Sequence, residues 1–175
     1  MKPFILTMFR SILLLMVIAL TSSGSFAQKN KRDSTTVASG KVREAEFYFT
    51  EGEKHFILEN YTKALIYYQK SLEINPNNAT VHYKIAQSLA QSDKQEDKLR
   101  ASSSIEHALA LEKKNRYFYL LAAEIYRDLV QFDKAAQIYE SMFKEVPDSQ
   151  EHLYELAAVY QYADQKEEAI NVYTR

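Results

Sequence analysis

The fold of this chain is decided by residues 117–147, which have the sequence YFYLLAAEIYRDLVQFDKAAQIYESMFKEVP. Two apolar segments with helical spacing flank a short turn, and each carries a small residue, Ala123 and Ala135. Pro147 ends the second segment, because proline lacks the backbone N–H and clashes with the preceding helical turn. The stretch therefore predicts two helices that cross closely where their side chains are small.

The same arrangement recurs along the chain in frames of about 34 residues, which is typical of helical-repeat arrays. We place the repeats at about 45–78, 79–115, 116–148 and 149–175, the last of them incomplete. In the first repeat the pattern predicts helices over residues 42–58 and 61–74. The second repeat is longer than the first, so we expect its segment 92–100 to protrude as a loop. In the first repeat the recurring residues are Tyr48, Gly52, His55, Tyr61, Ala64, Tyr68 and Pro76. In the third repeat the corresponding residues are Tyr119, Ala123, Tyr126, Phe132, Ala135, Tyr139 and Pro147.

This pattern resembles the tetratricopeptide repeat, whose frame is W-x2-L-G-x2-Y…A-x3-F…P. The resemblance covers residues 45–175, nearly all of the chain after its N-terminal segment. It implies an all-α fold, a right-handed α-solenoid of antiparallel helix pairs with about three and a half repeats over residues 42–175. It also implies that the domain binds proteins rather than catalyses a reaction.

The last repeat stops at Arg175, inside its second expected helix. Terminal repeats normally carry a polar outer face, whereas Val172 and Tyr173 are apolar residues close to this end. We therefore expect the chain to be a fragment of a longer array. The alternative is a complete protein whose last helix is short.

Residues 1–27 have the pattern of a secretory signal peptide: Lys2 and Arg10, the apolar run 12–20, and the small-residue site Ser25-Phe26-Ala27. The run is shorter than the roughly 20 residues that span a bilayer. We expect cleavage after Ala27 and export, in a bacterium to the periplasm or cell envelope; an uncleaved segment would instead attach the protein to the membrane. The polar residues 28–41 are expected to form a disordered linker.

Composition disfavours most kinds of chemistry. The chain has no cysteine and a net charge of −1, which indicates neither thiol chemistry nor a nucleic-acid-binding surface. Its three glycines, Gly24, Gly40 and Gly52, are too far apart for a phosphate-binding loop. Its four histidines are His55, His82, His107 and His152, and no two of them have a metal-binding spacing. We expect structural roles for His55 and His82. We predict a protein that is not an enzyme, with no catalytic residue, metal or cofactor.

The resemblance places ligands on the concave face, which the first helix of each repeat lines. The residues carried over to that face, the predicted protein-binding residues, are Phe49, Glu53, Phe56, Tyr83, Gln87, Tyr117, Glu124, Arg127, Tyr154 and Tyr162. The carboxylate clamp of co-chaperone members needs Lys and Asn where Phe49 and Glu53 stand here, so an acidic C-terminal peptide is not expected. The many aromatics favour a peptide or protein segment on an aromatic floor. The alternative is that these tyrosines only pack between helices.

These observations predict a non-catalytic protein–protein interaction scaffold of the cell envelope. An alternative is a sensory or cell-wall-associated input domain of a longer protein, whose effector module follows residue 175. Neither the partner nor the biological process follows from the sequence.

Overall fold

The structure is a computed structural model that describes residues 39–174. The expected signal peptide and residues 28–38 of the expected linker lie outside the described residues. The end of the predicted linker is wrong, because residues 39–41 already belong to a helix. The chain divides into two compact units, residues 1–43 and 44–175. In the first, residues 39–43 are helical; the description below concerns the second.

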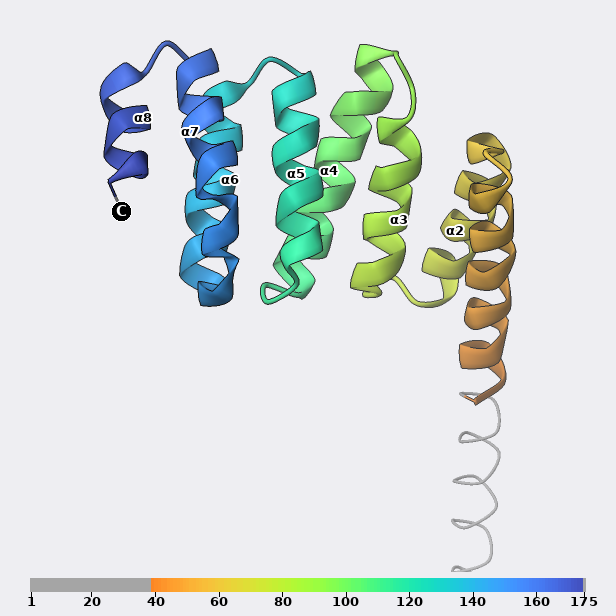
Figure 1. The fold of residues 1–175 in the computed structure, drawn as a ribbon. Coiled ribbons are helices and arrows are strands. Elements are labelled where there is room, and N and C mark those ends of the chain that lie inside the picture. Colours follow the sequence, from red (N-terminus) through yellow and green to blue (C-terminus); the bar gives the residue numbers. More distant parts are fainter. Residues whose placement is uncertain (1–38, 175) are drawn as a thin grey trace, which may run out of the picture. The chain divides into compact units, whose positions relative to one another are not determined.

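Between residues 44 and 174 all regular structure is helical, and each helix packs against the next one in the chain (Figure 1). A first helix, unlabelled in Figure 1, includes residues 39–57. The others are α2 (Tyr61–Ile74), α3 (Ala79–Ala90), α4 (Gln95–Leu111), α5 (Arg116–Asp128), α6 (Phe132–Glu145), the 3-10 helix η1 (Pro147–His152), α7 (Leu153–Tyr162) and α8 (Lys166–Tyr173). The predicted all-α array of antiparallel helix pairs is confirmed. None of the helices described over residues 39–174 has the length and apolar character needed to cross a membrane.

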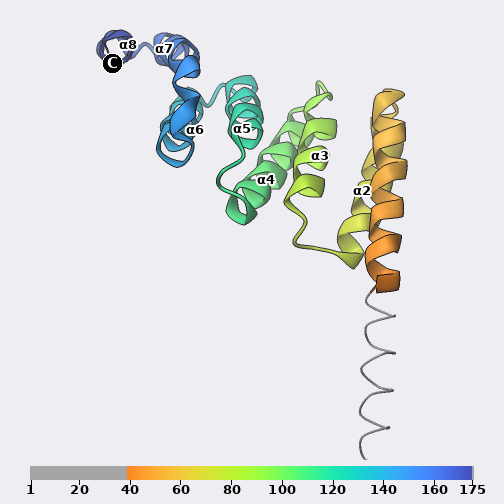
Figure 2. The same ribbon diagram turned by 60° about the horizontal axis from the view of Figure 1, so that its bottom comes forward.

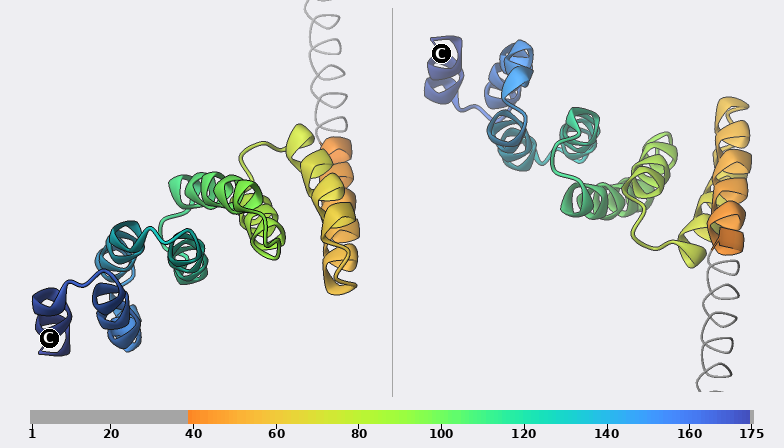
Figure 3. Two further views of the ribbon diagram at one scale, coloured as in Figure 1. Left: turned by 90° about the horizontal axis from the view of Figure 1, so that it is seen from above. Right: turned by 90° about the horizontal axis from the view of Figure 1, so that it is seen from below.

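We call the helix at residues 39–57, α3, α5 and α7 the A helices, and α2, α4, α6 and α8 the B helices. Seen from the side in Figure 2, A and B helices alternate along the chain. Seen from above and below in Figure 3, α3, α5 and α7 lie along one side of the unit, and α4, α6 and α8 lie along the other. The A helices are therefore positioned to form one continuous face.

Asparagine side chains fix the beginnings of three helices. The Oδ1 atoms of Asn60, Asn78 and Asn115 accept hydrogen bonds of 3.2 Å from backbone N–H groups two or three residues ahead, which otherwise lack a helical partner. The breaks between repeats are equally local, since α2 ends at Ile74, two residues before Pro76. The second predicted helix, residues 61–74, is confirmed.

Three of the four turns that join an A helix to its B helix have the same unusual geometry. Glu59, Val130 and Asp164 adopt positive φ angles of 56°, 59° and 58°. The residue after each one donates its N–H back to the A helix, as in Asn60 N to His55 O at 2.9 Å and Gln131 N to Tyr126 O at 2.8 Å. This is the Schellman motif, in which glycine is the usual left-handed residue. The array forms it without glycine.

The predicted loop over residues 92–100 is wrong, because α4 already begins at Gln95. The turn is held by Ser92, whose hydroxyl donates to Asp97 Oδ2 at 2.8 Å and accepts from Lys94 N at 3.3 Å. Glu96 and Asp97 lie in the first turn of α4, where carboxylates stabilise the positive end of the helix dipole. The additional residues of the second repeat therefore extend α4 to 17 residues instead of protruding.

The core consists of two clusters of buried side chains that share α5. Phe118, Leu121, Ala122 and Ile125 pack with residues of α2, α3 and α4. Tyr119, Ala123 and Tyr126, on the other faces of the same helix, pack with residues of α6, α7 and α8. Helix α5 therefore couples the two halves of the array.

Buried polar contacts repeat together with the frame. Tyr126 donates to Glu106 of the preceding B helix, and Tyr160 donates to Glu140 at 3.5 Å in the next repeat. Burial, followed by this hydrogen bond and the nearby charge of Glu106, raises the pKa of Tyr126 to about 12. A neutral phenol therefore holds adjacent repeats together at physiological pH.

His55 and His82 both take part in packing. His55 stacks on Tyr67 with ring centroids 5.3 Å apart, and His82 stacks on His107 at the same separation. His82 Nε2 also lies 2.9 Å from the carbonyl oxygen of Pro76. These contacts agree with the structural role predicted for the two histidines, which stays a prediction.

Candidate functional site

All ten predicted protein-binding residues lie on the A helices, but the structure divides them into two groups. Those of the N-terminal half contact other parts of the unit, whereas most of those on α5 and α7 face solvent. The first group contains Phe49, Glu53, Phe56, Tyr83 and Gln87; the second contains Tyr117, Glu124, Arg127, Tyr154 and Tyr162. Their role in binding stays a prediction.

In the first repeat, the predicted residues are engaged by their neighbours. Tyr68, on α2, donates a hydrogen bond to Glu53 Oε1, and Lys84 of α3 pairs with Glu53 Oε2 at 2.9 Å. Lys84 also lies over the ring of Phe56, 5.1 Å from its centroid, while Phe49 packs against Tyr68 at 6.0 Å. These groups hold the first helix against α2 and α3, and Glu53 has little capacity left for a ligand.

Tyr83 and Gln87 lie one turn apart on α3. The ring of Tyr83 stacks on Phe118 of α5, with centroids 5.1 Å apart. Burial, followed by the charges of Glu124, Tyr117 and Glu53, raises the pKa of its phenol. The phenol of Tyr83 is therefore close to predicted residues from the first helix and from α5.

Three tyrosines of α5 and α7 are exposed: Tyr117 by 64%, Tyr154 by 73% and Tyr162 by 68%. Tyr154 touches Tyr173 at a centroid separation of 5.9 Å, and Tyr162 stacks on Phe132 at 5.7 Å. Exposed aromatic side chains with a polar tip are common at protein interfaces. These three tyrosines are therefore mostly open to solvent, whereas Tyr83 is packed against Phe118.

Glu124 and Arg127 are both exposed on α5. Arg127, Phe132 and Tyr162 line a small open cavity of about 290 Å³ near the end of the helix. Burial, followed by the charge of Glu155, raises the pKa of Tyr139; the charge of Arg127 opposes that shift and the charge of Glu124 adds to it. Arg127 follows Glu124 by three residues, so the two exposed side chains are neighbours on the surface of α5.

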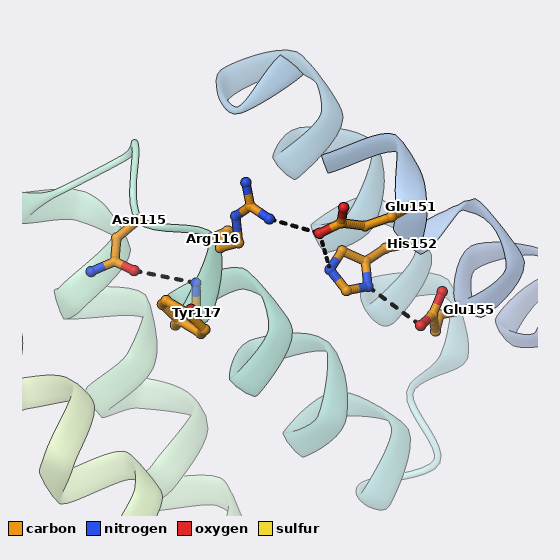
Figure 4. Close-up of polar contacts among 6 residues, drawn as sticks. All are labelled: Asn115, Arg116, Tyr117, Glu151, His152 and Glu155. Carbon is orange, nitrogen blue, oxygen red and sulfur yellow. Dashed lines mark hydrogen bonds and ion pairs between the residues drawn. The ribbon is translucent and has the colours of Figure 1, made fainter. Parts of the chain in front are cut away.

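Sequence reasoning missed a polar connection between the third and fourth repeats, shown in Figure 4. Arg116 Nη1 pairs with Glu151 Oε1 at 2.7 Å, and the two ring nitrogens of His152 lie 3.6 Å from Glu151 Oε1 and 3.3 Å from Glu155 Oε1. Since Arg116 and Glu151 are 35 residues apart, no local pattern joins them. The frame spacing of about 34 residues is the one signal that could have suggested their proximity.

A larger hollow of about 730 Å³ lies on the B side, between α6 and α8. Its walls combine polar and acidic side chains with the apolar surface of Ala136 and Tyr160; the polar and acidic residues include Asp133, Gln137, Glu140, Gln165 and Glu168. Gln165 Nε2 donates to Asp133 Oδ1 at 2.7 Å across it. Within residues 39–174, no three His, Cys, Asp or Glu side chains gather closely enough to hold a metal ion.

A family model of the tetratricopeptide repeat matches residues 45–78. No curated protein sequence matches the chain. Several solved structures share its fold. A crystal structure of MamA superposes with a TM-score of 0.67 at 17% identity, covering 82% of each chain. The first tetratricopeptide domain of Spaghetti (RPAP3), bound to the HSP90 peptide SRMEEVD, gives 0.61 at 21% identity, covering 70% of this chain and 98% of that one. The tetratricopeptide domain of Arabidopsis OM64 gives 0.57 at 17%, covering 73% and 98%.

Proposed function

We propose that this chain, in which residues 45–78 match the tetratricopeptide repeat and whose fold is shared by solved tetratricopeptide domains, binds an extended segment of a partner protein along α5 and α7. Tetratricopeptide arrays generally mediate protein–protein interactions, and one of the similar structures holds a peptide. The binding surface we propose consists of Tyr117, Tyr154 and Tyr162 together with Glu124 and Arg127.

The observation that carries this proposal is the exposure of three tyrosines on consecutive A helices. Each would lose a large apolar area to a partner, while a phenol hydroxyl remains available for orientation. Tyrosine has few rotatable bonds, so the entropy lost on binding is small for the area gained. No comparable set of exposed tyrosines lies on the described parts of α2, α4 and α6.

A photo-crosslinking amino acid placed at position 117 or 154 is expected to trap the same partner in cells, because both positions lie on the proposed surface. The double variant Tyr117→Ala/Tyr154→Ala should reduce partner capture at least about ten-fold, since interface tyrosines commonly contribute more than 1 kcal/mol each. Crosslinked products are identified by mass spectrometry.

Position 99 provides the matched control, because Leu99 is 48% exposed but lies on the B helix α4. Trapping of the same partner from position 99, or full capture by the double variant, would rule out the proposed surface. Circular dichroism must show that the double variant keeps its helices.

Because residues 1–27 are predicted to be a signal peptide, we extend the proposal to the cell envelope, where the repeat domain would bind an exported partner. Mass spectrometry of the protein from cells is expected to give Gln28 as its first residue. A mature protein that retains Met1 and remains in the cytoplasm would contradict this location.

A further inference from the structure

We infer that the bound segment presents a lysine or arginine side chain to the surface where α3 meets α5, formed by Tyr83, Gln87, Tyr117 and Glu124. This inference rests on the proposed function and adds the chemistry of the partner. It differs from the recognition of an acidic peptide end, for which the first repeat lacks the basic residues.

The four side chains come together from two helices that touch. Tyr83 is fixed by its stacking on Phe118, 5.1 Å away, which leaves the phenol end of the ring near α5. Tyr117 and Glu124 are seven residues apart and therefore lie on one face of α5, the helix that carries Phe118; the charge of Glu124 also contributes to the raised pKa of the Tyr83 phenol. Gln87 follows Tyr83 by one helical turn on the same face of α3.

This region offers acceptors and aromatic faces. Gln87 Oε1 is buried and accepts no hydrogen bond from the described residues, so a donor brought into this region would satisfy it. Glu124 is exposed, and no cationic group within residues 39–174 forms an ion pair with it. An ammonium or guanidinium group supplies the several donors that such acceptors need, and it is also attracted to the face of a tyrosine ring.

Two of the lysines nearby are already paired with carboxylates of this chain. Lys84 pairs with Glu53 at 2.9 Å, and Lys98 pairs with Asp128 at 3.4 Å. Arg127 lies one turn beyond Glu124 and lines the cavity with Phe132 and Tyr162. Glu124 therefore presents an exposed carboxylate, unpaired within the described residues, on the side of α5 next to Tyr83, where it attracts a basic side chain and repels an acidic one.

The test measures binding of three labelled nonapeptide pools to the full chain by fluorescence anisotropy. The pools are identical mixtures that differ only in the central residue, which is arginine, citrulline or glutamate; citrulline keeps the shape of arginine without its charge. We expect the arginine pool to bind about ten-fold more tightly than the citrulline pool, a difference of about 1.4 kcal/mol. Raising the salt concentration should reduce this preference, because the pair is partly exposed.

Three variants identify the residue responsible. Glu124→Gln should abolish the preference for arginine, and Glu124→Arg should reverse it in favour of the glutamate pool. Glu73→Gln, a matched change at an exposed position of α2, should leave the preference unchanged. Both positions are exposed on the surface of a helix and accept these changes, and circular dichroism checks the fold.

Equal affinity of the three pools would overturn the inference, and so would an arginine preference that survives Glu124→Gln. The proposed function would stand in both cases if binding still required Tyr117 and Tyr154. Absence of binding by every pool would also overturn the inference. The proposed function has a separate test, because a negative result in the crosslinking experiment is what would contradict it.

Discussion

Replacing Tyr68 by Ala is expected to reduce the free energy of unfolding by about 3–5 kcal/mol, the range for truncating a buried aromatic side chain. Tyr68 is fully buried in the first core cluster, and its hydroxyl donates to Glu53. The variant leaves a cavity between α2 and the first helix and deprives Glu53 of a donor. Urea unfolding followed by circular dichroism measures the loss, and Tyr68→Phe separates the hydrogen bond from the ring.

A double-mutant cycle with Gly52 tests the packing that this prediction assumes. A Cβ atom at Gly52 would lie 2.5 Å from two ring carbons of Tyr68, so Gly52→Ala alone should cost about 1–3 kcal/mol through overpacking. In the Tyr68→Ala background the ring is gone, and the same change should instead stabilise the helix by up to about 1 kcal/mol. Gly40, which has no atom within 4 Å of such a Cβ, is the control. An equal cost of Gly52→Ala in both backgrounds would contradict the close approach.

Replacing Leu156 by Ala is expected to cost about 2–5 kcal/mol, with its effect concentrated at the other end of the array. Leu156 is fully buried in the second cluster, with Met142 and Val159. In a repeat array each unit is stabilised mainly by its neighbours. Hydrogen exchange should therefore accelerate in α6, α7 and α8 while α2 and α3 keep most of their protection, whereas Tyr68→Ala should have the opposite distribution.

Helix α5 should respond to both substitutions, because it contributes side chains to both clusters. Leu156→Met, which nearly conserves volume, is the control and should cost less than about 1.5 kcal/mol. Uniform acceleration over residues 44–174 in both variants would show that the unit unfolds in one cooperative step, contrary to this prediction.

The helices and their repeat could be predicted because their signals are local. The spacing of apolar residues, the small residues at Gly52 and Ala64, and the break at Pro76 place α2 within the bounds that the structure shows. The second repeat misled the prediction, because extra polar residues suit a loop and a lengthened helix equally well. The carboxylates of Glu96 and Asp97 at the first turn of α4 were the available sign of a helix.

The sequence could predict which residues belong to the candidate site, but not which of them are packed and which are exposed. The frame assigns Tyr83 and Tyr154 to equivalent positions of their repeats, yet Tyr83 stacks on Phe118 while Tyr154 is 73% exposed. That difference depends on the residue that the following helix happens to present. The pair formed by Arg116 and Glu151 was hidden for the same reason, since its members belong to different repeats.

The sequence by itself determined that this protein is an array of helix pairs, because helix formation, capping and chain breaks depend on neighbouring residues. The tertiary structure alone decided which aromatic and charged groups of the A helices remain free, because burial depends on contacts between repeats. It also decided that Glu59, Val130 and Asp164 take left-handed turns without glycine. There the packing of each helix pair compensates for a backbone conformation that these residues would not adopt alone.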